Sequence, residues 1–123
     1  MKITPAHLLL IAAILTCQLI AIISTLHLLI TGLFYEGNII TRVLYTNLGF
    51  GITSAILILA VLITLLLVSS RDNLSTGFKT GFLCAILIIV ALDAVNDLAA
   101  LFKWKEVYNV TLMIFSCVPM SWW

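Results

Sequence analysis

The chain has 123 residues, of which 63% are hydrophobic and only 9% are charged, and its formal net charge is +1. Soluble domains carry about a quarter charged residues, so this chain has too few of them to cover a surface that faces water. The small net charge also excludes the basic footprint of a nucleic-acid-binding protein, and no nucleic acid is expected as a partner. The composition predicts an all-α helical bundle embedded in a lipid bilayer.

Four apolar runs follow one another along the chain. A helix needs about 20 apolar residues to cross a bilayer. The first run, 8–34, is too long for the apolar core of a signal peptide, which has about 7–15 residues, so it is interpreted as a retained helix. The second and third runs cover 48–69 and 80–102, and the fourth covers 107–123. We therefore expect a polytopic integral membrane protein with four transmembrane helices.

The fourth run, 107–123, leaves two arrangements open. It is at the short limit for a membrane span, and Pro119 lies near its end. It either completes a single domain over residues 1–123 or forms a short C-terminal membrane segment after three spans. The connections between runs are short, which favours antiparallel packing of sequential helices. Before the third run, three side chains can cap a helix start: Asp72, Asn73 and Ser75.

The basic residues nearly balance across a four-span bundle. One side would carry Lys2, Arg71 and Lys79, and the other would carry Arg42, Lys103 and Lys105. The positive-inside rule therefore gives no clear orientation, although the free amino terminus favours an N-terminus inside. The sequence predicts a multi-pass protein without identifying its membrane.

Three polar side chains interrupt the third run. Asp93, Asn96 and Asp97 are spaced i, i+3 and i+4, which puts them on one face of a helix. A charge at the bilayer centre costs about 2.5–3.5 kcal/mol on insertion scales, so this face is expected to meet protein, water or a bound cation and not lipid. Three roles for Asp93, Asn96 and Asp97 stay open: a packing contact with another helix, a proton or cation path, or a metal or ligand site.

Other polar residues are expected at the same depth as the stripe. At about 1.5 Å per residue, His27 of the first run comes to the level of Asp97, and we predict these two side chains as the central pair of a polar pocket. The opposite half of the bilayer is expected to be aliphatic. Five further residues would support the polar layer: Ser24, Thr31, Asn47, Ser54 and Asn109.

The sequence offers no complete catalytic group. There are two histidines, and no Ser/His/Asp arrangement or Cys-x-x-Cys spacing can be assembled. A metal site built from Asp93, Asp97 and His27 is chemically possible, but the sequence does not assign a metal. We expect neither an enzyme as an isolated chain nor a cofactor.

Three functions fit these features. The first is a non-catalytic accessory subunit of a larger membrane complex, for example a membrane-bound oxidoreductase, in which other subunits meet the intramembrane acids. The second is a small homo-oligomeric proton or cation channel or transporter that uses Asp93 and Asp97. The third is a membrane-active immunity, exclusion or holin-like protein. The expected partners are the lipid bilayer and either other membrane subunits or further copies of the chain.

Overall fold

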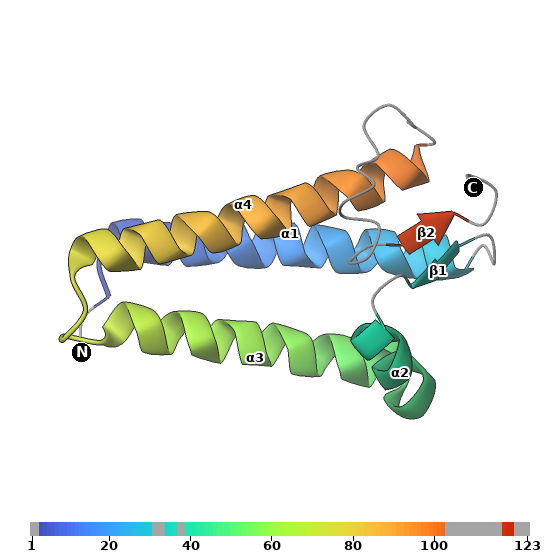
Figure 1. The fold of residues 1–123 in the computed structure, drawn as a ribbon, viewed down its shortest axis with the longest axis horizontal. Helices are drawn as coiled ribbons and strands as arrows, with labels where there is room; N and C mark the ends of the chain where they lie inside the picture. Colours follow the sequence, from blue (N-terminus) through green and yellow to red (C-terminus); the bar gives the residue numbers. More distant parts are fainter. Residues whose placement is uncertain (1–2, 31–33, 37–38, 103–116, 120–123) are drawn as a thin grey trace.

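Helices make up nearly all of the described structure. The computed structural model describes residues 3–30, 34–36, 39–102 and 117–119. In chain order its elements are α1 (Pro5–Ile30), β1 (Phe34–Glu36), α2 (Ile39–Leu48), α3 (Phe50–Ser70), α4 (Thr76–Leu101) and β2 (Cys117–Pro119). The predicted all-α helical bundle is confirmed, with one short pair of strands at one end (Figure 1).

Helices α1, α3 and α4 are each long and apolar enough to cross a membrane, with 26, 21 and 26 residues. A helix of 21 residues rises about 30 Å, which matches the hydrocarbon thickness of a bilayer. These helices correspond to the predicted runs 8–34, 48–69 and 80–102, so three apolar helices are confirmed, but the first ends at Ile30 and Phe34 belongs to strand β1. α2 is a further, shorter helix that none of the predicted runs covers.

The predicted fourth span, 107–123, lies largely outside the described residues. Within it the structure describes only Cys117–Pro119, which is an extended strand. This strand pairs antiparallel with β1, and Glu36 lies opposite Cys117. The helix prediction is therefore wrong for these three residues, because pairing between strands supplies partners for backbone groups here. For the remainder of the run it stays a prediction.

Hydroxyl side chains cap the starts of α1 and α4. Thr4 Oγ1 accepts a hydrogen bond of 3.2 Å from the backbone N–H of His7. Pro5 takes the first helical position, where a missing N–H has no consequence. Ser75 Oγ accepts from the backbone N–H of Phe78 at 3.1 Å, so Ser75 is the cap among the three predicted candidates.

Gly49 separates α2 from α3. Its φ of 82° lies in the left-handed region, which glycine adopts without the steric cost that a Cβ would bring. Backbone hydrogen bonding continues through this break, because the Gly49 N–H donates to the Tyr45 carbonyl and its own carbonyl accepts from Thr53. The chain can therefore change direction at Gly49 while its backbone groups stay paired.

α1 and α4 run parallel and lie side by side, and α3 runs antiparallel along them (Figure 1). Two hydrogen bonds fix the register of the parallel pair. One joins His7 Nε2 and Thr80 Oγ1 at 2.9 Å, and the other runs from Thr25 Oγ1 to Asp97 Oδ2 at 2.8 Å. The main packing is therefore between the first and the last spanning helices, and not between sequential helices as the short connections predicted.

The contact between α1 and α4, called here the α1–α4 seam, follows a heptad-like spacing. On α1, six of the seven buried positions and the half-buried Gln18 recur at alternating intervals of four and three residues: His7, Ile11, Ile14, Gln18, Ala21, Thr25 and Leu28. The seventh buried residue, Ser24, lies beside Thr25. This spacing keeps one stripe of a helix against its neighbour over many turns. The seam therefore runs nearly the whole length of α1.

The seam divides into two parts with different chemistry. The apolar half is built from four buried residues of three helices: Ile11, Ile14, Leu65 and Leu83. The polar half lies nearer the carboxyl ends of α1 and α4 and holds four buried residues of these two helices: Ser24, Thr25, Asn96 and Asp97. Thr53 and Ser54 of α3 are buried as well. Beyond the apolar half, His7 and Thr80 form a small polar contact at the outer end. The polar half is therefore the candidate functional region of the bundle.

Candidate functional site

The hydrogen bond between Thr25 and Asp97 lies at the centre of the polar half. Asp97 is 1% exposed and Thr25 is 7% exposed, so both side chains are removed from the surroundings of the bundle. The Thr25 hydroxyl donates to the Asp97 carboxyl group across the α1–α4 seam. Small residues of α4, Ala94 and Ala100, are buried beside it and allow the two helices to approach closely.

The predicted pairing of His27 with Asp97 is not what the structure shows. His27 is exposed on α1, and its place beside Asp97 is taken by Thr25. The two positions are two residues apart on a helix, a rotation of about 200°, so they point to nearly opposite sides. The prediction compared only the depths of His27 and Asp97 along their helices. The rotation of α1 about its own axis turns the His27 side chain outward.

The remaining predicted residues divide into three groups. Ser24 on α1, Ser54 on α3 and Asn96 on α4 are buried. Asn47 is exposed on α2, where its Nδ2 donates to the Val43 carbonyl of its own helix at 3.0 Å, so it does not join this layer. Two further predictions, Thr31 and Asn109, lie outside the described residues.

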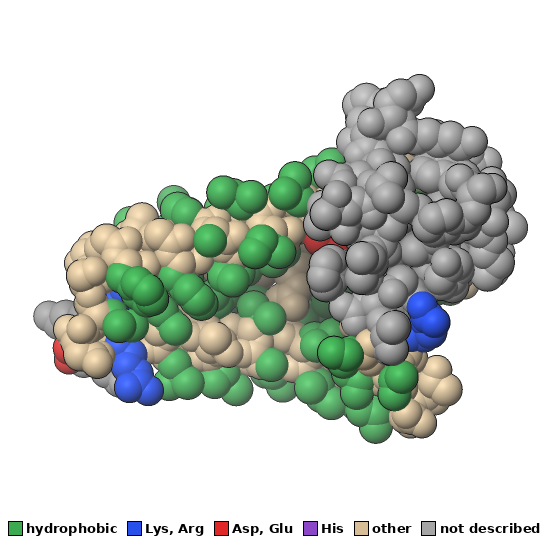
Figure 2. Space-filling view, viewed as in Figure 1, with side chains coloured by type: hydrophobic (Ala, Val, Ile, Leu, Met, Phe, Trp, Pro, Cys, Tyr) green, Lys and Arg blue, Asp and Glu red, His purple; other side chains and the backbone are tan. Residues whose placement is uncertain are grey.

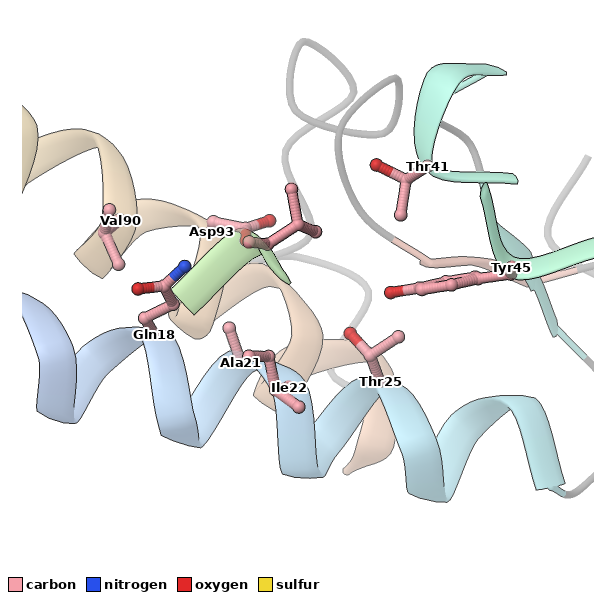
Figure 3. A pocket seen from close by; sticks show the side chains of 9 residues that line it. Gln18, Ala21, Ile22, Thr25, Thr41, Tyr45, Val90 and Asp93 are labelled. Carbon is pink, nitrogen blue, oxygen red and sulfur yellow. The ribbon is translucent and has the colours of Figure 1, made fainter. Parts of the chain in front are cut away.

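Asp93 lines a pocket between the helices. The pocket has a volume of about 170 Å³ and draws its walls from α1, α2, α3 and α4. Its polar lining consists of Asp93 together with Gln18, Thr25, Thr41 and Tyr45. Figure 3 shows the hydroxyl groups of Tyr45 and Thr25 directed toward the space beside Asp93. We call this feature the Asp93 pocket.

Thr25 connects the Asp93 pocket with the buried Asp97. It lines the pocket and also donates its hydroxyl proton to Asp97. A hydroxyl group has one proton and two acceptor lone pairs. With that proton directed to Asp97, Thr25 Oγ1 has only acceptor capacity left. Both intramembrane acids are thus part of one polar arrangement, with Asp97 inside the seam and Asp93 at the pocket.

The apolar lining of the same pocket comes from four residues: Ala21, Ile22, Leu57 and Val90. Leu57 is the contribution of α3, which otherwise packs mainly through the apolar half. The pocket therefore combines hydrogen-bonding groups with an aliphatic wall. Such a mixture is typical of sites for small molecules, in which a few polar groups set the orientation of a ligand.

The acidic residues do not assemble a metal site in the part of the chain that the structure describes. No group of three or more His, Cys, Asp or Glu side chains is close enough there to hold a metal ion. The possible set of Asp93, Asp97 and His27 fails because His27 is exposed and turned away from the seam. The described side chains around Asp93 offer hydroxyl and amide groups instead.

Apart from Asp93, the polar residues of the pocket were not among the predicted site residues: Gln18, Thr25, Thr41 and Tyr45. A signal for two of them exists in the sequence. Gln18 and Thr25 are seven residues apart and continue the heptad spacing of Ile11 and Ile14. For Thr41 and Tyr45 the sequence has no comparable signal, because α2 lies outside the long apolar runs.

Comparisons of this chain with protein-family models, with curated proteins and with solved structures found no match.

Proposed function

We propose that this chain is a multi-pass integral membrane protein in which α1, α3 and α4 cross the bilayer. The distribution of charge supports this. Beyond the first turn of α4, the only charged residues of these three helices are Asp93 and Asp97. Figure 2 shows the Lys and Arg side chains near two ends of the molecule, with hydrophobic side chains along the length between them. Lipid tails accept such a surface, whereas water would not.

The exposed polar side chains of the helices support the same proposal. The hydroxyl groups of Thr16 on α1 and Thr64 on α3 each donate to the backbone carbonyl four residues earlier, at 2.8 Å. In a bilayer core, polar groups on the outside of a helix need partners within the protein, because no water is present to supply them. Each of these hydroxyl groups has such a partner on its own helix.

We further propose that the protein is a small, non-enzymatic cation or proton channel or transporter in which Asp93 contacts the transported ion. One observation carries this proposal: Asp93 opens onto a polar pocket inside the helical bundle. An ionisable residue within a membrane-spanning helix typically marks a substrate or ion pathway. The pocket brings together polar groups of three helices around that residue, as a pathway requires.

The accessory-subunit function is the competing proposal. Its main support in the sequence was that two intramembrane acids need partners on other subunits. Within this chain, however, Asp97 is buried and accepts a hydrogen bond from Thr25, and the half-buried Asp93 lines a pocket between the helices. The acids therefore do not by themselves require another subunit, and the channel or transporter proposal is the simpler one.

Reconstitution tests the proposed function. The full chain is purified in mild detergent, its mass is measured by native mass spectrometry, and proton and K⁺ flux is recorded in liposomes. We expect a self-associated oligomer with flux, and we expect Asp93→Asn to remove that flux. Asp72→Asn is the matched control, because Asp72 is an exposed acid between α3 and α4.

Two results would contradict the channel or transporter proposal. One is flux that Asp93→Asn leaves unchanged. The other is stoichiometric co-purification of large unrelated subunits together with an absence of flux, which would support the accessory-subunit function. In that case Asp93→Asn should release the partner subunits, and Asp72→Asn should not.

A further inference from the structure

We infer that the Thr25 hydroxyl group passes protons between water in the Asp93 pocket and the carboxyl group of Asp97, so that the transported species is the proton. This inference rests on the proposed function and deepens it, because it names the ion and gives Asp97 a part in its path. Three observations carry it: the position of Thr25, the volume of the pocket and the hydrogen-bonding groups of its lining.

Thr25 contacts both ends of the proposed relay. It lines the Asp93 pocket, and its hydroxyl group donates a hydrogen bond of 2.8 Å to Asp97 Oδ2 (Figure 3). Asp97 is only 1% exposed and is not itself part of the pocket lining. Thr25 therefore provides a hydrogen-bonded connection from the pocket to an acid that lies behind it.

The pocket is large enough for a small cluster of water molecules. Its volume is about 170 Å³. A water molecule takes about 30 Å³ in the liquid, so about five of them fit, provided that polar groups bind them. Gln18 Oε1 is buried and has no hydrogen-bond partner among the described residues, so it can accept a proton from water. Three hydroxyl groups also belong to the lining, those of Thr25, Thr41 and Tyr45.

The lining suits water and protons better than a dehydrated metal cation. A K⁺ ion that leaves its hydration shell needs oxygen atoms all around it, as rings of carbonyl groups provide in selective channels. Part of the wall is aliphatic and offers no ligand to an ion: Ala21, Ile22, Leu57 and Val90. A proton needs only a chain of groups that both donate and accept hydrogen bonds, and water and hydroxyl groups do both.

The transfer to Asp97 balances in one step, which starts with Asp97 as a carboxylate. A hydrated proton in the pocket binds to a lone pair of Thr25 Oγ1, and an O–H bond forms there. The original Oγ1–H bond breaks as its proton moves to Asp97 Oδ2, so Asp97 becomes a carboxylic acid and Thr25 stays neutral. The reverse step returns the proton to the pocket.

The relay moves the proton along the bundle. Asp97 follows Asp93 by four residues on α4, which is a rise of about 6 Å toward the carboxyl end of that helix. A proton that passes from the pocket through Thr25 to Asp97 therefore advances by about one helical turn. The two intramembrane acids then act in sequence along one path.

Proton flux in liposomes that contain the full chain, recorded with an internal pH-sensitive dye, tests this inference. Thr25→Val keeps the side-chain volume and removes the hydroxyl group. We expect it to lower the flux by about tenfold or more, since a positioned proton-transfer group contributes at least that much. Thr25→Ser keeps the hydroxyl group and should retain most of the flux. Thr16→Val is the matched control, because the Thr16 hydroxyl is exposed and bonded to its own helix.

The unmodified chain gives a second test that depends on no variant. Its vesicles should show proton flux without K⁺ flux, and the proton flux should fall in D₂O, because each transfer moves a proton between oxygen atoms. Gln18→Leu removes a buried acceptor for water and should lower the proton flux severalfold. Native mass spectrometry checks that each variant keeps the assembly of the unmodified chain.

Three results would overturn the inference: proton flux that Thr25→Val leaves unchanged, a loss in Thr25→Ser as complete as in Thr25→Val, or K⁺ flux comparable with the proton flux. If K⁺ flux occurs and Asp93→Asn removes it while Thr25→Val does not, the proposed function stands and the proton relay alone fails. If the unmodified chain carries neither ion, both fail.

Discussion

The two halves of the α1–α4 seam use the same helices in different ways. In the apolar half, α3 contributes Leu65 to a core with Ile14 and Leu83, and all three side chains are almost fully buried. In the polar half, hydrogen bonding joins α1 to α4 directly through Thr25 and Asp97. A pocket remains there between the helices, with α3 supplying part of its wall.

The two halves of the seam are therefore expected to contribute differently to stability and to function. The apolar half also has an open pocket, of about 200 Å³, and its lining is almost wholly apolar: Ala60, Val61, Leu65, Phe82 and Ile86, with Thr64. The two halves differ in the chemistry of their pockets, because Gln18, Thr25 and Asp93 bring hydrogen-bonding groups to the pocket of the polar half. We therefore expect the apolar half to hold the bundle together and the polar half to determine what it binds.

The largest expected effect is in a crosslinking experiment, because its outcome is all or none. In a background without the native cysteines, Thr25→Cys with Asp97→Cys should form a disulfide on oxidation in membranes, and His27→Cys with Asp97→Cys should not. The reason is that Thr25 Oγ1 lies 2.8 Å from Asp97 Oδ2, whereas His27 is exposed. A disulfide between positions 27 and 97, with none between positions 25 and 97, would contradict the rotation of α1 that places Thr25 against Asp97.

Truncation in the apolar half should have the next largest effect. Leu83→Ala is expected to lower the free energy of unfolding by about 2–3 kcal/mol, because it leaves a cavity in the core. This value lies toward the lower end of the range for such substitutions. Lipid is as apolar as leucine, so the substitution loses packing contacts but little hydrophobic free energy. Unfolding in mixed micelles measures it, and Leu59→Ala is the control, with a change within about 0.5 kcal/mol at this exposed position. Equal effects of both substitutions would contradict the assigned core.

Removal of the seam hydrogen bond should have the smallest effect on stability. Thr25→Val keeps the volume of the side chain and removes the donor to Asp97, with an expected loss of about 1 kcal/mol in the free energy of unfolding. The same micelle experiment measures this change, and Thr16→Val again serves as the control. If Thr25→Val lowered the free energy of unfolding more than Leu83→Ala does, the result would contradict the assignment of the larger stabilising contribution to the apolar half.

The spanning helices could be predicted from the sequence because they depend on local composition. Long apolar runs fix α1, α3 and α4 to within a few residues at each end. The start of α4 was also predictable, since Ser75 is one of three suitable caps before it. The depth of the polar residues followed from the helical rise alone, which is why Asn96 and Asp97 fall in the same layer as Ser24.

The rotation of α1 could not be predicted with the same reasoning. Apolar side chains surround this helix on every side, so hydrophobicity does not reveal which face packs against protein. His27 and Thr25 both lie at the right depth, and the choice between them depends on how the seam meets Asp97. The helix α2 was missed because its ten residues, with Arg42 and Asn47 among them, form no long apolar run.

The parallel course of α1 and α4 has an electrostatic consequence. The peptide dipoles of a helix place about half a negative elementary charge at its carboxyl end. Both of these helices end on the same side as the polar half, and the amino end of α3, which lies there too, offsets only one of them (Figure 1). The backbone itself therefore adds negative potential at the carboxyl ends of α1 and α4, within about the last turn of each helix, and on α4 that turn directly follows Asp97.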